Sequence, residues 1–110
     1  RFEGNAHGSL TVNQVAAGRK NRMFMEIYGS KKSLAINTER CNELWVGNRD
    51  DANQVIMKDP SLLAERARDI VSYPGGHNEG FADTSKQMFI KIYRHILNGA
   101  SGAVEFPTFK

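Results

Sequence analysis

The residues best suited to chemistry lie in one glycine-rich stretch, 73–83, which reads Tyr-Pro-Gly-Gly-His-Asn-Glu-Gly-Phe-Ala-Asp. Its glycines and its proline set a particular backbone path, and loops held on a rigid scaffold often carry binding residues. His77 has a side chain that can donate, accept or titrate near neutral pH. We therefore expect His77 and its neighbour Asn78 to contact a substrate. The alternative is that His77 only braces the loop by bonding to a backbone carbonyl.

A second candidate is the bend from Ala17 to Arg22, where Arg19 can make forked hydrogen bonds to a carboxylate or a phosphate. A solvated hairpin tip explains this bend equally well, so Arg19 is the weaker candidate. Metal binding by His77, Glu79 and Asp83 is possible by ligand type, but no spacing such as His-Glu-x-x-His supports it. We expect no metal site.

The common cofactor and nucleophile motifs are missing from the sequence. There is no Gly-x-Gly-x-x-Gly after a strand, no Gly-x-x-x-x-Gly-Lys-Ser/Thr loop and no Gly-x-Ser-x-Gly elbow. We therefore name no catalytic residue and expect no cofactor to be bound by this chain.

The elements that must position these residues begin with strands. Alternation of apolar and polar residues, broken by turn residues, is typical of strands with two distinct faces. The short turns between them favour antiparallel hairpins. The pattern predicts a largely antiparallel meander of about five to six strands, the clearest being 9–17, 22–28, 33–37, 43–46 and 54–58.

Two helices should follow the sheet. The first begins at Asp59-Pro60 and continues to about Ile70, because Pro suits the first helical turn and apolar residues then recur at helical spacing. The second is capped by Thr84 with Gln87 as its reciprocal partner, and Gly99 ends it. Its apolar stripe should lie in the core, and comprises Phe89, Ile92, Tyr93, Ile96 and Leu97. The fold class is α+β, with one sheet face left open for oligomerisation.

Composition fits one soluble domain spanning residues 1–110. Hydrophobic residues make up 40% of the chain and charged residues 25%, and Cys41 is the only cysteine, so no disulfide within the chain is expected. The net charge is +3, but acids and bases alternate, so we expect no nucleic-acid partner. No apolar run is long enough to span a membrane, and the first residues, 1–4, carry no export signal. We expect a cytoplasmic protein, either complete or a fragment of a longer one.

Several segments resemble one family, the Gfo/Idh/MocA dehydrogenases, named for glucose-fructose oxidoreductase and inositol dehydrogenase. The resemblance is to their C-terminal domain. It is carried by residues 8–21, 26–31, 42–47 and 73–81, which together span most of the chain. Their order and spacing are similar to those of a branch that acts on sugars or polyols.

The resemblance implies a two-domain enzyme whose N-terminal Rossmann domain binds NAD or NADP. The C-terminal α+β domain would shape the pocket for a sugar or polyol, and its open sheet face would form the interface of a homo-oligomer. His77 matches the family's Gly-Gly-His loop. The Rossmann domain, the Glu-Lys-Pro segment with its catalytic Lys and the Asp-x-x-x-His segment have no counterpart here. No catalytic residue is therefore carried over.

We therefore expect the substrate-binding and oligomerisation domain of an NAD(P)-dependent sugar or polyol dehydrogenase, inactive by itself. The alternative is a freestanding α+β binding or oligomerisation module without enzymatic activity, in which the Gly-Gly-His loop is structural.

Overall fold

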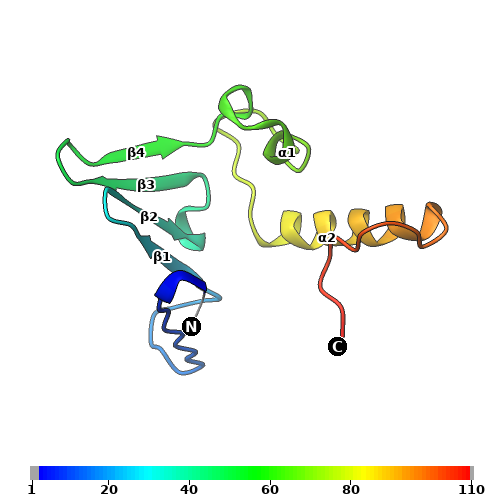
Figure 1. Ribbon diagram of the computed structural model, residues 1–110, viewed down its shortest axis with the longest axis horizontal. Coiled ribbons are helices and arrows are strands. Elements are labelled where there is room, and N and C mark those ends of the chain that lie inside the picture. Colours follow the sequence, from blue (N-terminus) through cyan, green and yellow to red (C-terminus); the bar gives the residue numbers. More distant parts are fainter. Residues whose placement is uncertain (1–2, 110) are drawn as a thin grey trace.

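The computed structural model describes residues 3–109, so Arg1 and Phe2, two of the first residues considered above, lie outside it. Four strands come first and two helices follow, which makes the fold α+β (Figure 1). The strands are β1 (Phe24–Tyr28), β2 (Lys32–Asn37), β3 (Glu43–Asn48) and β4 (Gln54–Met57). The helices are α1 (Glu65–Arg68) and α2 (Phe81–Leu97), and single 3-10 turns span Glu3–Asn5, Thr38–Arg40 and Pro60–Leu62.

The sheet is an antiparallel meander in which every strand pairs with its neighbour in sequence, in the order β1-β2-β3-β4. Because side chains alternate across a strand, the register separates two faces. The apolar face carries Met25, Ile27, Leu34, Ile36, Leu44, Val46 and Ile56. The mixed face carries Phe24, Glu26, Tyr28, Ser33, Ala35, Asn37, Glu43, Trp45, Val55 and Met57.

The strand expected at 9–17 does not form, and the prediction of about five to six strands is not confirmed by the four that the structure contains. Residues 9–17 are exposed, with Leu10 and Val15 each 89% accessible. A strand is completed by hydrogen bonds to a neighbouring strand, and this segment pairs with none within residues 3–109. An alternating pattern therefore was not enough to make a strand.

The first predicted helix is much shorter than expected. A 3-10 turn at Pro60–Leu62 is followed by a single helical turn, α1, instead of one helix continuing to Ile70. The Asp59 carboxylate caps the 3-10 turn by accepting hydrogen bonds from the backbone and the hydroxyl of Ser61. Leu63 then adopts an extended conformation, which interrupts the helix.

The second helix forms, but it begins earlier than predicted. It starts at Phe81, and the carboxylate of Asp83 accepts a hydrogen bond from the backbone N–H of Gly80 at 2.9 Å. Thr84 is inside the helix, where its hydroxyl donates to the carbonyl of Phe81, so Thr84 does not act as the cap. Gly99 ends the helix in the left-handed conformation (φ 70°), as predicted.

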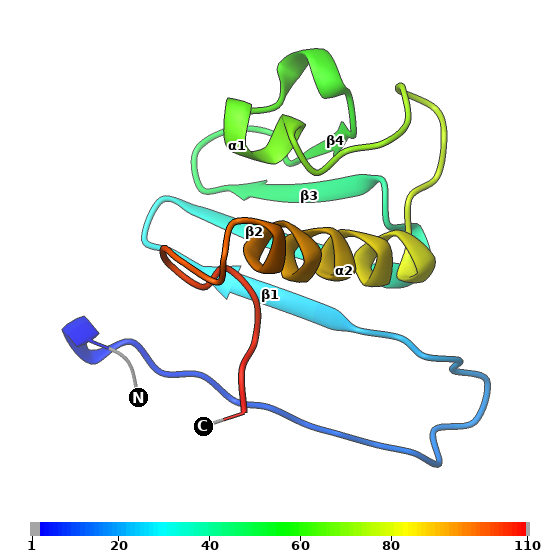
Figure 2. The same cartoon turned by 90° about the vertical axis from the view of Figure 1, so that its right-hand side faces the viewer.

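The chain is more open than a folded domain of its length. Its Cα radius of gyration is 16.9 Å, whereas about 13 Å is typical for this length. Among the apolar side chains of residues 4–109, Val46 alone is buried, at 5% accessibility. Figures 1 and 2 show α2 as an arm separate from the sheet. The close backbone contacts between elements join strand to strand, so few side chains are covered from both sides.

The apolar stripe of α2 is consequently not in a core, contrary to the prediction. Phe89, Tyr93, Ile96 and Leu97 are all exposed, because within residues 4–109 no element covers them. The C-terminal tail lies along α2 without regular secondary structure. The ring of Phe106 meets that of His95 edge to face at 5.5 Å, and Glu105 pairs with Lys91. No helix in the described part of the chain has the length and apolar character needed to cross a membrane.

Candidate functional site

The loop that carries His77 is fastened to the sheet by two side chains from other elements. Asn42, just before β3, donates from its Nδ2 to the carbonyl oxygen of His77 and to the Oδ1 of Asn78, both at 2.8 Å. Lys58, just after β4, donates from its Nζ to the same His77 carbonyl at 3.0 Å. Asn42 is 9% accessible. Among residues 4–109 it is the one polar residue that is buried. The loop backbone is thus held against the end of the sheet.

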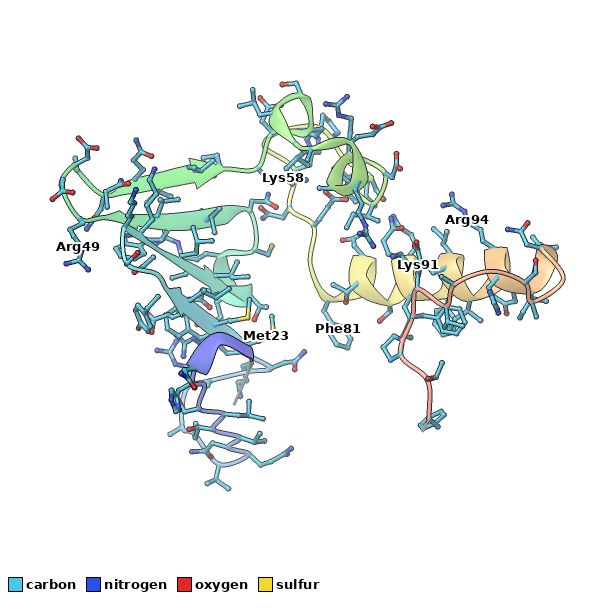
Figure 3. The ribbon with its side chains drawn as sticks, viewed as in Figure 1. Met23, Arg49, Lys58, Phe81, Lys91 and Arg94 are labelled. Carbon is cyan, nitrogen blue, oxygen red and sulfur yellow. The ribbon has the colours of Figure 1, made fainter. Side chains whose placement is uncertain are left out.

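Lys58 and Glu79 form an ion pair within this fastening. The Nζ of Lys58 lies 2.5 Å from Oε2 of Glu79, and each side chain is 12% accessible. The other carboxylate oxygen of Glu79 accepts from the backbone N–H of Ser72. Figure 3 shows Lys58 where β4 leaves the sheet, beside the segment that leads to α2. The pair therefore joins the beginning of the loop, its end and the sheet.

The pKa of Glu79 is set by opposing effects. Burial raises the pKa, and the charge of Asp83 adds to that. The hydrogen bonds from Lys58 and from the Ser72 backbone, together with the charge of Lys58, outweigh them, so the pKa lies below its ordinary value. Glu79 is therefore ionised at neutral pH, as its pairing with Lys58 requires.

The side chains of His77 and Asn78 themselves are exposed. The Nδ1 of His77 lies 3.3 Å from the carbonyl oxygen of Gly75. This long contact is compatible both with a bracing role for the imidazole and with contact to a substrate. Asn78 uses its Oδ1 to accept from Asn42, while its NH₂ group has no partner within residues 3–109. The oxygen and nitrogen of this amide are assigned by that hydrogen bond. Both residues can therefore offer polar groups to a ligand.

Arg19 is already engaged by an acid. Its guanidinium lies 2.7 Å from the carboxylate of Glu39, and that of Arg22 lies 3.4 Å from the same oxygen. Arg22 also sits over the ring of Phe24, 4.7 Å from its centroid. Arg19 keeps an exposed side chain, at 54%, so it can still reach an anion, but only in competition with Glu39.

The connection between β2 and β3 links the two candidate segments. Glu39 in this connection holds Arg19, and Asn42, three residues later, holds His77 and Asn78. Segments distant in sequence are thereby anchored to the same end of the sheet. Sequence reasoning missed Glu39, Asn42 and Lys58, because single polar residues beside turns carry no motif.

Metal and nucleotide binding find no support in the described residues. Within residues 3–109 no group of three or more His, Cys, Asp or Glu side chains is arranged to hold a metal ion. The glycine-rich loop follows α1 and not a strand, so it lacks the strand-turn-helix arrangement that cradles a dinucleotide. The loop at residues 73–80 therefore does not have the geometry of a dinucleotide-binding turn.

A separate groove lies between α1, α2 and the tail, with a volume of about 320 Å³. Its charged lining includes Arg66, Lys91, Arg94 and Glu105. Figure 3 shows Lys91 and Arg94 on α2, away from Lys58. Neither His77 nor Asn78 lines this groove, so it is distinct from the candidate site.

The fold defined by this meander and its following helices also occurs in solved structures of oxidoreductases. One, from Sinorhizobium meliloti, matches with a TM-score of 0.73 and 24% identity, covering 86% of this chain and 27% of that protein. Another, from Pseudomonas syringae, matches with a TM-score of 0.73 and 24% identity, covering 84% and 27%. This chain thus spans about a quarter of the length of either structure. No protein-family model and no curated protein matches it.

Proposed function

We propose that this chain is the substrate-binding and oligomerisation domain of an NAD(P)-dependent sugar or polyol dehydrogenase of the Gfo/Idh/MocA family, inactive by itself. The observation that carries the proposal is the loop of His77 and Asn78. Its backbone is held by Asn42 and Lys58, while its side chains remain exposed to a ligand. The fold shared with two oxidoreductases supports the same class.

The chemistry of a polyol suits these groups. A sugar hydroxyl both donates and accepts, so the imidazole of His77 and the NH₂ group of Asn78 are complementary to neighbouring hydroxyls. Arg19 stands at the end of the sheet as a weaker contact for an anionic substituent.

The redox step requires parts that this chain does not supply. The hydride would pass from a carbinol carbon of the sugar to NAD⁺ or NADP⁺, and the hydroxyl proton would go to a base. Another domain of the same polypeptide would hold the cofactor and provide that base. The role of residues 1–110 is then to bind and orient the sugar, in a cytoplasmic enzyme.

The open sheet supports the oligomer in this proposal. Met25, Ile27, Leu34 and Ile56 share the apolar face and are exposed. The chain exposes 9844 Å², against about 6,100 Å² for a folded monomer of this size. The apolar face would pack against the same face of a second subunit.

The test is turnover by the product of the complete gene that encodes this sequence. The purified protein is assayed with NAD⁺ and NADP⁺ against D-glucose, D-xylose and myo-inositol by the absorbance of reduced nicotinamide. We expect turnover by the complete product and none by the 110-residue chain. In the complete product, His77→Ala should lower kcat/KM by about tenfold or more through loss of one positioned hydrogen bond.

The opposite result favours the freestanding module. If the complete gene encodes only these residues, or if the complete product turns over no sugar or polyol, the dehydrogenase proposal is wrong. The chain would then act as a binding or oligomerisation module in which the loop is structural.

A further inference from the structure

His77 combines a fixed backbone with an unrestrained side chain. Its carbonyl oxygen accepts two hydrogen bonds, from Asn42 Nδ2 at 2.8 Å and from Lys58 Nζ at 3.0 Å. Its imidazole is exposed and makes one long contact, 3.3 Å to the carbonyl of Gly75. A loop that served only to connect two helices would not need two side chains from the ends of β3 and β4 on one carbonyl.

The residues that hold this carbonyl are themselves fixed from several sides. Lys58 also contacts the carbonyl of Tyr73 at 3.4 Å and forms the ion pair with Glu79. Asn42 accepts from the backbone N–H of Glu79 at 3.4 Å through its Oδ1. Glu79 in turn accepts from the N–H of Ser72. The loop is therefore tied at its beginning, its middle and its end.

Burying the Lys58–Glu79 ion pair costs desolvation free energy, and this cost has a purpose if the loop must keep one shape. Removing two opposite charges from water carries a desolvation penalty that their attraction often only balances, so a largely buried ion pair is weak support for stability alone. The pair does provide geometric specificity, because each hydrogen bond fixes the position of the atom that it reaches. The bonds converge on the backbone of His77 and the side chain of Asn78.

We propose that Asn42, Lys58 and Glu79 are positioning residues for the substrate. They hold His77 and Asn78 so that the imidazole and the Asn78 NH₂ group meet two hydroxyl groups of a sugar or polyol in one fixed geometry. The NH₂ group is available because Asn42 occupies the Oδ1 of the same amide. This inference rests on the proposed function, and it adds the residues that determine orientation without touching the substrate.

The experiment is a double-mutant cycle in the complete gene product. Its probe is whichever of D-glucose, D-xylose and myo-inositol the unmutated protein turns over fastest. Lys58→Met removes one of the two donors to the His77 carbonyl, and His77→Ala removes the imidazole that Lys58 is proposed to position. Lys31→Met is the matched control, because Lys31 is exposed and forms no ion pair within residues 3–109.

Lys58→Met should lower kcat/KM by about tenfold or more, because a small misplacement of a binding group strongly lowers the rate. Lys31→Met should leave kcat/KM unchanged. In the His77→Ala background the further loss from Lys58→Met should be much smaller than in the parent, because the imidazole is gone and only Asn78 is left to position. A merely structural role predicts the opposite, with the loss from Lys58→Met persisting in the His77→Ala background. That additive result overturns the inference.

Asn42→Ala provides a second route if Lys58→Met does not fold. It keeps the ion pair and removes the donors to His77 and Asn78, and it should give the same loss and the same lack of additivity. An unchanged kcat/KM in both Asn42→Ala and a folded Lys58→Met contradicts the inference while leaving the proposed function intact. If His77→Ala itself has no effect, or no sugar is turned over, the proposed substrate contact is wrong and the inference falls with it.

Discussion

Replacing either Lys58 or Glu79 leaves the charge of the other without its partner. Both side chains are 12% accessible, so water cannot replace a lost partner effectively. Ser72 and His77 complete the hydrogen bonding of the pair through their backbones. The energetic effect of a substitution here therefore depends on whether it leaves a charge behind.

Lys58→Met should destabilise the protein, because it leaves the carboxylate of Glu79 largely buried without its cation. Breaking a buried pair in this way costs about 3 kcal/mol of the free energy of unfolding. The control, Lys31→Met, changes an exposed lysine and should stay within about 0.5 kcal/mol of the parent. Denaturant unfolding measures both. Equal stabilities for the two variants would contradict the role of the pair.

Glu79→Gln should change how stability depends on pH. The pKa of Glu79 in the folded protein lies below its ordinary value of 4.5, mainly because hydrogen bonds from Lys58 and Ser72 overcome the effect of burial. Ionised Glu79 therefore contributes stability above the ordinary pKa, and that contribution is lost as the pH falls through the lower, folded value. Unfolding midpoints of parent and Glu79→Gln should differ most at neutral pH and converge in acid. A constant difference would count against this assignment.

At the scale of the strand, Trp45 depends on the absence of a side chain at Gly47. A Cβ at position 47 would lie 2.4 Å from Cη2 of Trp45, much closer than real carbon atoms approach. Gly47→Ala should therefore cost about 1–3 kcal/mol, as overpacking does. In a Trp45→Leu background the same substitution should cost much less, because the clashing ring is gone. Thermal unfolding of the four proteins checks this, and an equal cost in both backgrounds would show that the ring is not responsible.

The end of α2 offers a reciprocal pair of substitutions. Gly99 and Ala100 both have positive φ, 70° and 55°, a conformation that suits glycine and strains alanine. Gly99→Ala should destabilise the protein by about 1 kcal/mol, whereas Ala100→Gly should leave stability unchanged or raise it by about 0.5 kcal/mol. Unfolding curves of the two variants decide the matter. Destabilisation by Ala100→Gly would contradict the left-handed conformation at that residue.

At the scale of the molecule, the exposed apolar surface predicts self-association. Leu34 lies on the apolar face, between Ile27 and Val46 of the neighbouring strands. Leu34→Glu should weaken any dimer formed through that face, because a carboxylate would be buried without a partner. Ser33→Glu places the same charge on the mixed face and serves as the control. Sedimentation velocity of the 110-residue chain at micromolar concentration is the measurement, and a monomer before any substitution would contradict the proposed interface.

The sequence by itself determined the local elements whose signals are local. The β1-β2 hairpin, the two later strands and the end of α2 at Gly99 follow from alternation, short turns and the conformational freedom of glycine. In each case the deciding interactions lie within a few residues or between adjacent strands.

Only the tertiary structure decided what depends on partners distant in sequence. Residues 9–17 have the pattern of a strand, but a strand exists only where another strand accepts its hydrogen bonds. The stripe of α2 is apolar, but burial requires a second surface, which the part of the chain described here does not bring to it. Likewise, the sequence indicated the loop of His77, whereas Asn42 and Lys58 could be recognised only after the fold brought them to its carbonyl.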